Sequence, residues 1–247
     1  YGGMSCKISE IKKITEDNKL LLIEDAAESL GSSVHGEKVG SISDTAIFSF
    51  CGNKVLTTGE GGAVVTNDKS IYEKIKLIRS HGRLDKQSYF DNPNSPDYVG
   101  LGYNWRMSSI TAALGISQLQ KLDKIINMRQ ENAKYISSRL SKFSQIILPK
   151  STPSYENIYQ MFTIRLPDKH TQTNLQTFLL KKKIFCKVYF NPIHLSPFYK
   201  QKYNLESNML PNTEKISQQI LTLPMYPNMT LEEKNYLVES ISEFFEI

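Results

Sequence analysis

Short apolar runs and one amphipathic helix pattern organise the first part of the chain. Isoleucines recur at helical spacing among charged residues at 8–18, which predicts a surface helix. Apolar runs follow at 20–23, 45–50 and 63–66, each bounded by polar or glycine residues. Runs of this kind are typical of buried strands in parallel sheets. The pattern therefore predicts an α/β fold with a mostly parallel sheet and helices on both faces.

Helix patterns dominate the middle of the chain, and a smaller α/β unit is expected after them. An amphipathic helix is predicted at 70–79, a polar loop at 83–99 and a long helical region at 107–143. The last part is predicted to contain strands at 160–166 and 184–190 and helices at 171–182, 212–220 and 231–244. We place the boundary between the two parts at residue 124.

Composition limits the possible functions. The chain has 247 residues, 40% of them hydrophobic, which allows a sizeable core. Its net charge of +5 is spread along the chain, and no aromatic-basic stripe indicates a nucleic-acid partner. The three cysteines are widely spaced and odd in number, which predicts neither a disulfide framework nor a metal site and fits a reducing cytoplasm. No signal peptide or long apolar run is visible, so we expect a soluble cytoplasmic protein without a membrane partner.

Chemically active side chains gather where the first two apolar runs end. Asp25 follows the first run, and Glu28 lies in an expected short helical turn after it. Ser49 ends the second run, and Lys54 follows in a Gly-Asn-Lys turn. Because ligands of open α/β sheets bind beyond the carboxyl ends of the strands, these side chains are expected at one edge.

This set of groups suits pyridoxal phosphate (PLP). A lysine amine can attach an aldehyde, a carboxylate can keep a pyridine nitrogen protonated, and a hydroxyl at a turn suits a phosphate. Taken singly, Lys54 can also be interpreted as a surface lysine and Asp25 as a helix N-cap. The two together, at two strand ends in this order, favour the PLP interpretation.

Longer motifs carry a resemblance to a known family. They are EDAAESLG at 24–31, SF followed by GNK at 49–54, TTGEGGAVVTND at 57–68 and GYNWRM at 102–107, with PIHLSPFYK and TLPMYPNMT further on. Over nearly its whole length the chain resembles the DegT/DnrJ/EryC1/StrS family of PLP-dependent sugar aminotransferases. It most resembles the 4-aminotransferases that act on nucleotide-linked 4-keto-6-deoxy sugars, such as perosamine synthases. The resemblance implies aminotransferase fold type I, with the C-terminal part of the large PLP-binding domain at 1–124 and the small domain at 125–247.

The resemblance also implies roles for individual residues. Lys54 would attach PLP covalently and Asp25 would face the pyridine nitrogen, which makes them the catalytic pair. Ser49 would bind the cofactor phosphate, and Glu28 would lie near the ring oxygen or the incoming sugar. Asn104 would reach the cofactor phosphate of a partner subunit, so a homodimer with shared active sites is expected.

For two further residues the resemblance leaves two possible roles each. Arg106 either structures its loop or meets a substrate phosphate. His194 either lies in the sugar pocket or is a satisfied structural histidine. Trp105 is expected to pack rather than to recognise a ligand, and no metal site is expected.

The implied reaction transfers an amino group, with glutamate as the expected donor, to a nucleotide-linked keto sugar used in cell-surface polysaccharide such as O-antigen. A 3-aminotransferase and a catalytically silent binding or regulatory protein of the same fold are the alternatives. Related dehydratases replace the lysine by histidine, whereas Lys54 is present. A plain nucleotide-binding domain would need a G-x-G-x-x-G turn, and the sequence has none.

The start of the chain predicts a missing portion. Tyr1-Gly2-Gly3 resembles a turn that family members carry about a third of the way along their chains. The phosphate loop and ring-stacking aromatic residue of the family's N-terminal portion are not visible. We therefore expect this sequence to be the C-terminal part of a longer protein.

Overall fold

The computed structural model of the protein describes residues 1–83 and 97–246. Most of the polar loop predicted at 83–99 thus lies outside the described residues. None of the described helices is long and apolar enough to cross a membrane.

The chain forms two compact units. Unit one consists mainly of residues 5–123 and 154–156, and unit two of residues 2–4, 124–153 and 157 to the C-terminal end. The assignment of a PLP-binding domain at 1–124 and a small domain at 125–247 stays a prediction.

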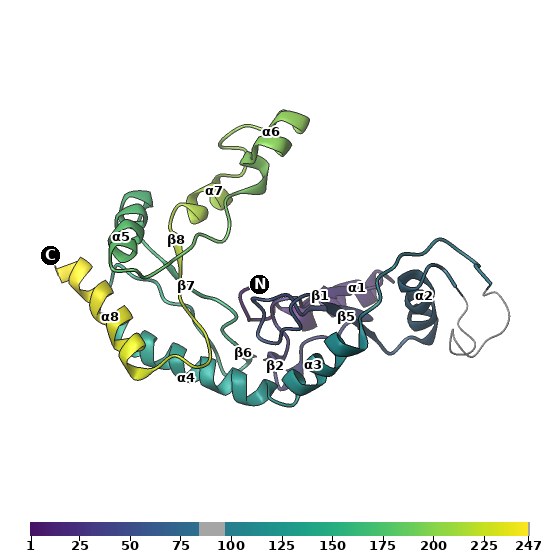
Figure 1. Ribbon diagram of the computed structural model, residues 1–247. Helices are drawn as coiled ribbons and strands as arrows, with labels where there is room; N and C mark the ends of the chain where they lie inside the picture. Colours follow the sequence, from purple (N-terminus) through teal and green to yellow (C-terminus); the bar gives the residue numbers. More distant parts are fainter. Residues whose placement is uncertain (84–96, 247) are drawn as a thin grey trace. The chain divides into compact units, whose positions relative to one another are not determined.

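The main sheet of unit one has three strands. They are, in spatial order, β1 (Ile23–Asp25), β4 (Thr45–Ser49) and β5 (Gly62–Thr66) (Figure 1). β1 and β4 run parallel, whereas β5 runs antiparallel to β4 after the glycine-rich loop turns the chain back. The sheet described here is therefore partly parallel.

The two faces of this sheet differ in their exposure to solvent. Glu24 pairs with Ala46, and both side chains are buried. On the opposite face Asp25 pairs with Ile47, and Ile47 pairs with Val64. Ile47 and Val64 are exposed, and so is Ile23, at 68%. The prediction of strands buried on both faces is thus wrong for the described residues, because no described element covers this second face.

The first strand begins later than its apolar run suggested. Leu20 and Leu21 are exposed and precede β1, whereas Leu22 is buried with Ile8 and Val34. Ile8 opens α1 (Ile8–Asp17), the predicted surface helix. An unpredicted small sheet lies beside these residues. It contains β3 (Glu37–Lys38), β2 (Ser33–Val34) and β6 (Tyr155–Glu156).

The helices from α2 to α4 follow the predicted pattern with one correction. α2 (Lys69–Arg79) is capped by Asp68, whose carboxylate accepts the backbone N–H groups of Ser70 and Ile71. The long helical region predicted at 107–143 is two helices, α3 (Ser109–Leu119) and α4 (Leu122–Leu140). Residues 120 and 121 separate them, which the apolar periodicity did not reveal.

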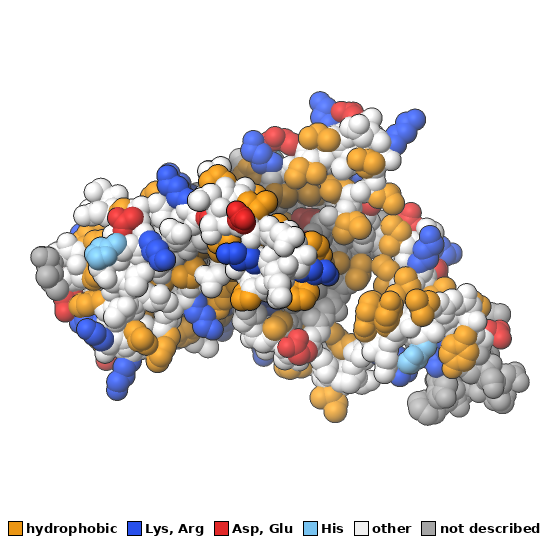
Figure 2. Space-filling view, turned by 90° about the horizontal axis from the view of Figure 1, so that it is seen from above, with side chains coloured by type: hydrophobic (Ala, Val, Ile, Leu, Met, Phe, Trp, Pro, Cys, Tyr) orange, Lys and Arg blue, Asp and Glu red, His pale blue; other side chains and the backbone are white. Residues whose placement is uncertain are grey.

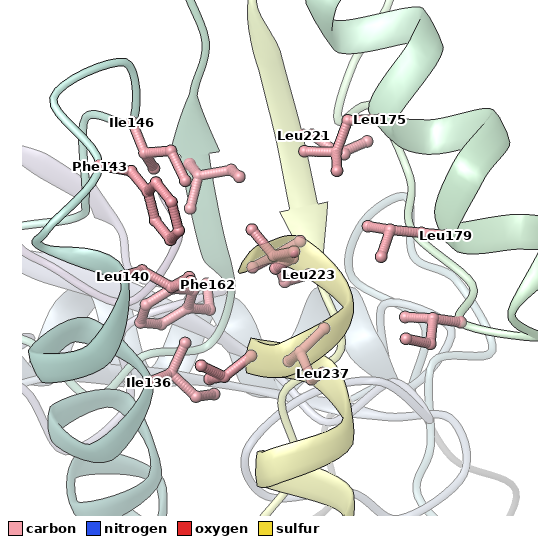
Figure 3. Close-up of a cluster of buried hydrophobic side chains, with 14 of the residues drawn as sticks. Ile136, Leu140, Phe143, Ile146, Phe162, Leu175, Leu179, Leu221, Leu223 and Leu237 are labelled. Carbon is pink, nitrogen blue, oxygen red and sulfur yellow. The ribbon is translucent and has the colours of Figure 1, made fainter. Parts of the chain in front are cut away.

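Unit two is built around the antiparallel pair β7 (Phe162–Arg165) and β8 (Ile220–Leu223). Leucine, isoleucine and phenylalanine side chains from these strands meet those of α4, α5 (Lys169–Lys181) and α8 (Leu231–Glu246) in one core (Figure 3). Phe162, Leu175 and Leu221 are fully buried in it. Burial of this cluster in one core stabilises unit two.

The segment between α5 and β8 differs most from the sequence prediction. The strand predicted at 184–190 is reduced to one isolated bridge between Lys187 and Thr222. The chain instead forms a short 3-10 turn, η1 (Ile193–Leu195), and the helices α6 (Pro197–Tyr203) and α7 (Pro211–Ser217) (Figure 1). The helix predicted at 212–220 ends at Ser217, because its last residues start β8.

A close backbone contact joins residues 81–82 to residues 100–103. The N–H of His81 donates to the Tyr103 carbonyl at 2.9 Å, and Gly82 adopts a φ of +70°. A Cβ at Gly102 would lie 1.9 Å from the Gly82 nitrogen, so only glycine fits there. A Cβ at Gly100 would meet nothing within 4 Å.

This contact gives a prediction about stability. Gly102→Ala should lower the free energy of unfolding by about 1–3 kcal/mol, because backbone atoms must move to admit the methyl group. The matched variant Gly100→Ala should change it little. Chemical denaturation of both variants measures the difference, and equal midpoints would contradict the proposed contact.

Candidate active site

Two predicted site residues end neighbouring parallel strands. Asp25 is the last residue of β1 and Ser49 the last residue of β4. Because Asp25 pairs with Ile47, Ser49 lies two residues further along the same face of the sheet. The Asp25 carboxylate accepts the N–H of Ala27 at 3.1 Å, and a turn rather than the predicted helical segment follows it. The structure therefore brings a carboxylate and a hydroxyl to one edge.

Lys54 lies in a loop whose two ends are tied together. The N–H of Lys54 donates to the Cys51 carbonyl at 3.0 Å and closes a turn. At the base of the loop, Phe50 donates to the Gly61 carbonyl and accepts from the N–H of Thr58, both at 2.9 Å. Val55 and Leu56, which follow Lys54 directly, are buried. These contacts fix the backbone from which the lysine side chain extends.

The ammonium of Lys54 is paired with Glu28. Its Nζ atom lies 2.9 Å from Oε1 of Glu28, and the two side chains are only 14% and 17% exposed. Glu28 belongs to the turn after β1, so this ion pair joins the ends of β1 and β4. The burial disagrees with the interpretation of Lys54 as a surface lysine. Shielding from water also makes the attraction stronger than that of an ordinary surface pair.

The glycine-rich loop packs closely against the segment that follows Gly102. A Cβ at Gly61 would lie 2.7 Å from Oγ1 of Thr58 and 2.9 Å from Cε of Met107. A Cβ at Gly115 of α3 would lie 3.1 Å from Cγ2 of Thr58, so even a methyl group would require Thr58 to shift slightly. The loop after Lys54 is thus in contact with Met107 and α3.

Asn104 and Arg106 form a second group in unit one. Nε of Arg106 donates to Oδ1 of Asn104 at 2.9 Å. The N–H of Trp105 donates to the Arg79 carbonyl at 2.9 Å, which fixes this segment beside the end of α2. The Trp105 ring stacks on Tyr103 with 4.2 Å between ring centroids and is 65% exposed. Trp105 thus packs against Tyr103, as expected, but stays largely exposed in the described part of the chain.

His194, the last predicted site residue, lies in unit two and has a carboxylate partner. Its Nε2 atom is 3.0 Å from Oε1 of Glu214, and these side chains are 10% and 11% exposed. Glu214 also accepts the N–H groups of Asn208 and Leu210. The N–H of Asn208 first, and the hydrogen bond from His194 second, lower the pKa of Glu214 below its ordinary value.

Sequence reasoning missed Glu214. The available signal was weak, namely an acidic residue in the first turn of a helix that begins with proline. The roles of Lys54, Asp25, Glu28, Ser49 and Asn104 at a cofactor, and of Arg106 and His194 at a substrate, stay predictions.

Comparison with known proteins gives consistent results. The profile of the DegT/DnrJ/EryC1/StrS aminotransferase family matches residues 1–242. GDP-perosamine synthase of Escherichia coli O157:H7 is 32% identical over 98% of this chain and 63% of its own. UDP-4-amino-4,6-dideoxy-N-acetyl-beta-L-altrosamine transaminase of Campylobacter jejuni is 34% identical over 100% of this chain and 64% of its own. The chain thus spans slightly less than two thirds of these curated relatives.

A solved structure agrees in fold. Helicobacter pylori PseC, described as an aminotransferase involved in the biosynthesis of pseudoaminic acid, superposes with a TM-score of 0.90 at 29% identity. The superposition covers 100% of this chain and 65% of that one. The predicted fold class, type I of the PLP-dependent aminotransferases, is confirmed by this likeness.

The ion pair at the strand ends gives a prediction of energetic coupling. Lys54→Met and Glu28→Leu should each lower the free energy of unfolding, and the double variant should lower it by less than their sum. We expect a coupling energy of about 0.5–3 kcal/mol, because the pair is mostly shielded from water. The measurement is a double-mutant cycle by chemical denaturation.

The control is an ion pair at the surface with a similar N···O distance. Lys142 and Glu246 are 2.8 Å apart with side chains 57% and 58% exposed. The cycle with Lys142→Met and Glu246→Leu should give roughly 0.2–1 kcal/mol. Equal coupling in the two cycles would show that burial adds nothing to the Lys54 pair.

Proposed function

The chain belongs to the DegT/DnrJ/EryC1/StrS aminotransferase family, and we propose that it is part of a PLP-dependent enzyme that aminates a nucleotide-linked 4-keto-6-deoxy sugar. The observation that carries this proposal is the mostly buried Lys54 amine, held by Glu28 at the edge where β1 and β4 end. Relatives at 32% and 34% identity are named as a GDP-perosamine synthase and as the transaminase of a UDP-linked 4-amino sugar, which supports a nucleotide-linked sugar as the class of substrate. The ring position and the sugar follow from this likeness alone.

The side chains at this edge fit PLP as a set. When bound, PLP supplies an electron-withdrawing ring that stabilises negative charge on the substrate carbon. Lys54 offers the amine that attaches its aldehyde, and Asp25 the carboxylate for the pyridine nitrogen. Ser49 offers a hydroxyl for the phosphate, two residues beyond the partner of Asp25 on the same sheet face. The exposed Ile47 and Val64 give that face an apolar surface for a ring.

Proton transfer is the second task of Lys54. Once released from the cofactor, its amine can carry a proton to and from the reacting carbon. Glu28 lies within hydrogen-bond distance of Nζ and can hold the protonated form in place between these steps. Glutamate as amino donor, and substrate contacts by Arg106 and His194, belong to the same proposal.

A homodimer with shared active sites is also part of the proposal. Large hydrophobic side chains are exposed along 98–119, and no residue of α3 is buried. Figure 2 shows hydrophobic side chains exposed in several patches on one face of the molecule. Such surfaces favour burial against another polypeptide. A second copy would cover this segment and bring its Asn104 to the partner's cofactor phosphate.

A catalytically silent protein of the same fold is the main alternative, and a 3-aminotransferase is the alternative within the enzymes. The joint presence of Lys54, Asp25, Ser49 and Asn104 favours an enzyme over a silent protein.

The first prediction from this proposal concerns Lys54. With PLP present, borohydride should attach the cofactor permanently to the wild-type peptide that contains Lys54, and mass spectrometry should detect the added mass. The protein should also aminate at least one member of a panel of nucleotide-linked keto sugars with glutamate. Lys54→Ala should lose both properties, whereas Lys13→Ala, at an exposed lysine, should keep them. Normal turnover by Lys54→Ala would defeat the assignment.

The second prediction concerns the shared site. Asn104→Ala and Lys54→Ala proteins should each be inactive alone. After unfolding and refolding together, roughly a quarter of the wild-type sites should be restored, because half of the dimers are mixed and each carries one intact site. Asn104→Ala mixed with the double variant Lys54→Ala/Asn104→Ala should restore none. Absence of any gain in the first mixture would contradict a contribution of Asn104 across subunits.

A further inference from the structure

The Glu214 carboxylate connects three parts of the segment between α5 and β8. Oε2 of Glu214, on α7, accepts the N–H of Asn208 at 2.9 Å, and Oε1 accepts the N–H of Leu210 at 3.3 Å. Oε1 is also the partner of Nε2 of His194 in η1, at 3.0 Å. One nearly buried carboxylate therefore fixes a loop, a helix and a histidine relative to one another.

We infer that Glu214 is a positioning residue that holds the proton of neutral His194 on Nε2, so that Nδ1 is presented as a hydrogen-bond acceptor for a hydroxyl of the sugar substrate. The substrate part of this inference rests on the proposed function. The tautomer part rests on the geometry of this segment alone.

The tautomer follows from the donors around Glu214. Its two oxygens already accept two backbone N–H groups, which requires acceptor oxygens at both positions. These hydrogen bonds also lower the pKa of Glu214, so the carboxylate has no proton to give. The contact with His194 then needs a hydrogen on Nε2, and the neutral ring keeps its lone pair on Nδ1.

Nδ1 is available for a ligand. Among the described residues no hydrogen-bond partner lies at this atom, although the side chain is only 10% exposed. Two exposed aromatic side chains lie close to His194 along the chain: Phe190 precedes it and Phe198 follows it. A single fixed acceptor, in a segment that also carries exposed aromatic side chains, suits a sugar ring, which offers hydroxyl donors and apolar C–H faces.

The tautomer can be measured without any activity assay. Two-bond ¹H–¹⁵N correlation spectra of the imidazoles distinguish Nε2–H from Nδ1–H, and His194→Gln identifies the signals of His194. Wild type above the titration range should show Nε2–H, and Glu214→Gln should show a mixture, because an amide both donates and accepts. Glu206→Gln, at an exposed carboxylate of the same segment, should leave the spectrum unchanged. An Nδ1–H tautomer of His194 in the wild-type spectrum would overturn the inference.

Kinetics test the contact with substrate. Glu214→Gln should raise KM for the aminated keto sugar about 3- to 10-fold, as expected for one weakened hydrogen bond, and leave KM for glutamate unchanged. Glu214→Asp, which keeps the negative charge, should raise KM for the keto sugar by less than Glu214→Gln does. Unchanged KM for the sugar, with the tautomer altered, would overturn the contact to substrate. Failure of every keto sugar in the panel would instead count against the proposed function, and the tautomer spectrum would still decide the role of Glu214.

Discussion

The ion pair between Lys54 and Glu28 is the contact on which the candidate site depends. A lysine side chain that is only 14% exposed loses much of its hydration, and a nearby carboxylate must offset this loss. Glu28 supplies that carboxylate from the turn after β1, whereas Lys54 comes from the loop after β4. The pair thus fixes the distance between two strand ends that only parallel pairing brings together. Asp25 and Ser49, the last residues of these strands, are positioned by the same arrangement.

A second constraint is apolar surface that the described chain leaves uncovered. Ile23, Ile47 and Val64 lie on one face of the main sheet, and α3 is apolar around its circumference without a buried residue. Hydrophobic area of this extent costs free energy in water unless another surface covers it. The core of unit two shows the contrast, because apolar side chains from its strands and helices meet in one buried cluster. The exposed side chains of α3 are those that the second copy of the proposed homodimer would cover.

The sequence predicted the elements well where one periodicity extended over many residues. α1, α2, α5 and α8 lie within a few residues of their predicted ranges because a 3.6-residue repeat of apolar positions is a strong signal. The strand predicted at 184–190 was wrong because an apolar run does not specify a pairing partner. Within this range of the described chain, only Lys187 forms a bridge. In the site, strand-end position indicated Asp25, Ser49 and Lys54, whereas the Lys54–Glu28 contact required the coordinates of two turns. Glu214 was missed because its partners are backbone N–H groups, which no side-chain motif records.

Three glutamates show how environment, rather than residue type, separates structural from chemical tasks. Glu24 is buried and accepts the N–H of Gly40 and the hydroxyl of Ser43, so all its contacts hold the loop before β4. Glu28 is paired with the Lys54 ammonium, whose charge would have to change in the proposed reaction. Glu214 combines a structural and a chemical contact. Two backbone N–H groups hold its carboxylate in place, and the imidazole of His194 is its third hydrogen-bond partner. A carboxylate that is immobilised by backbone donors can impose a proton position on its third partner, because it cannot rotate to follow that partner. The same hydrogen bonds that stabilise the segment around α7 would therefore decide which nitrogen of His194 meets a ligand.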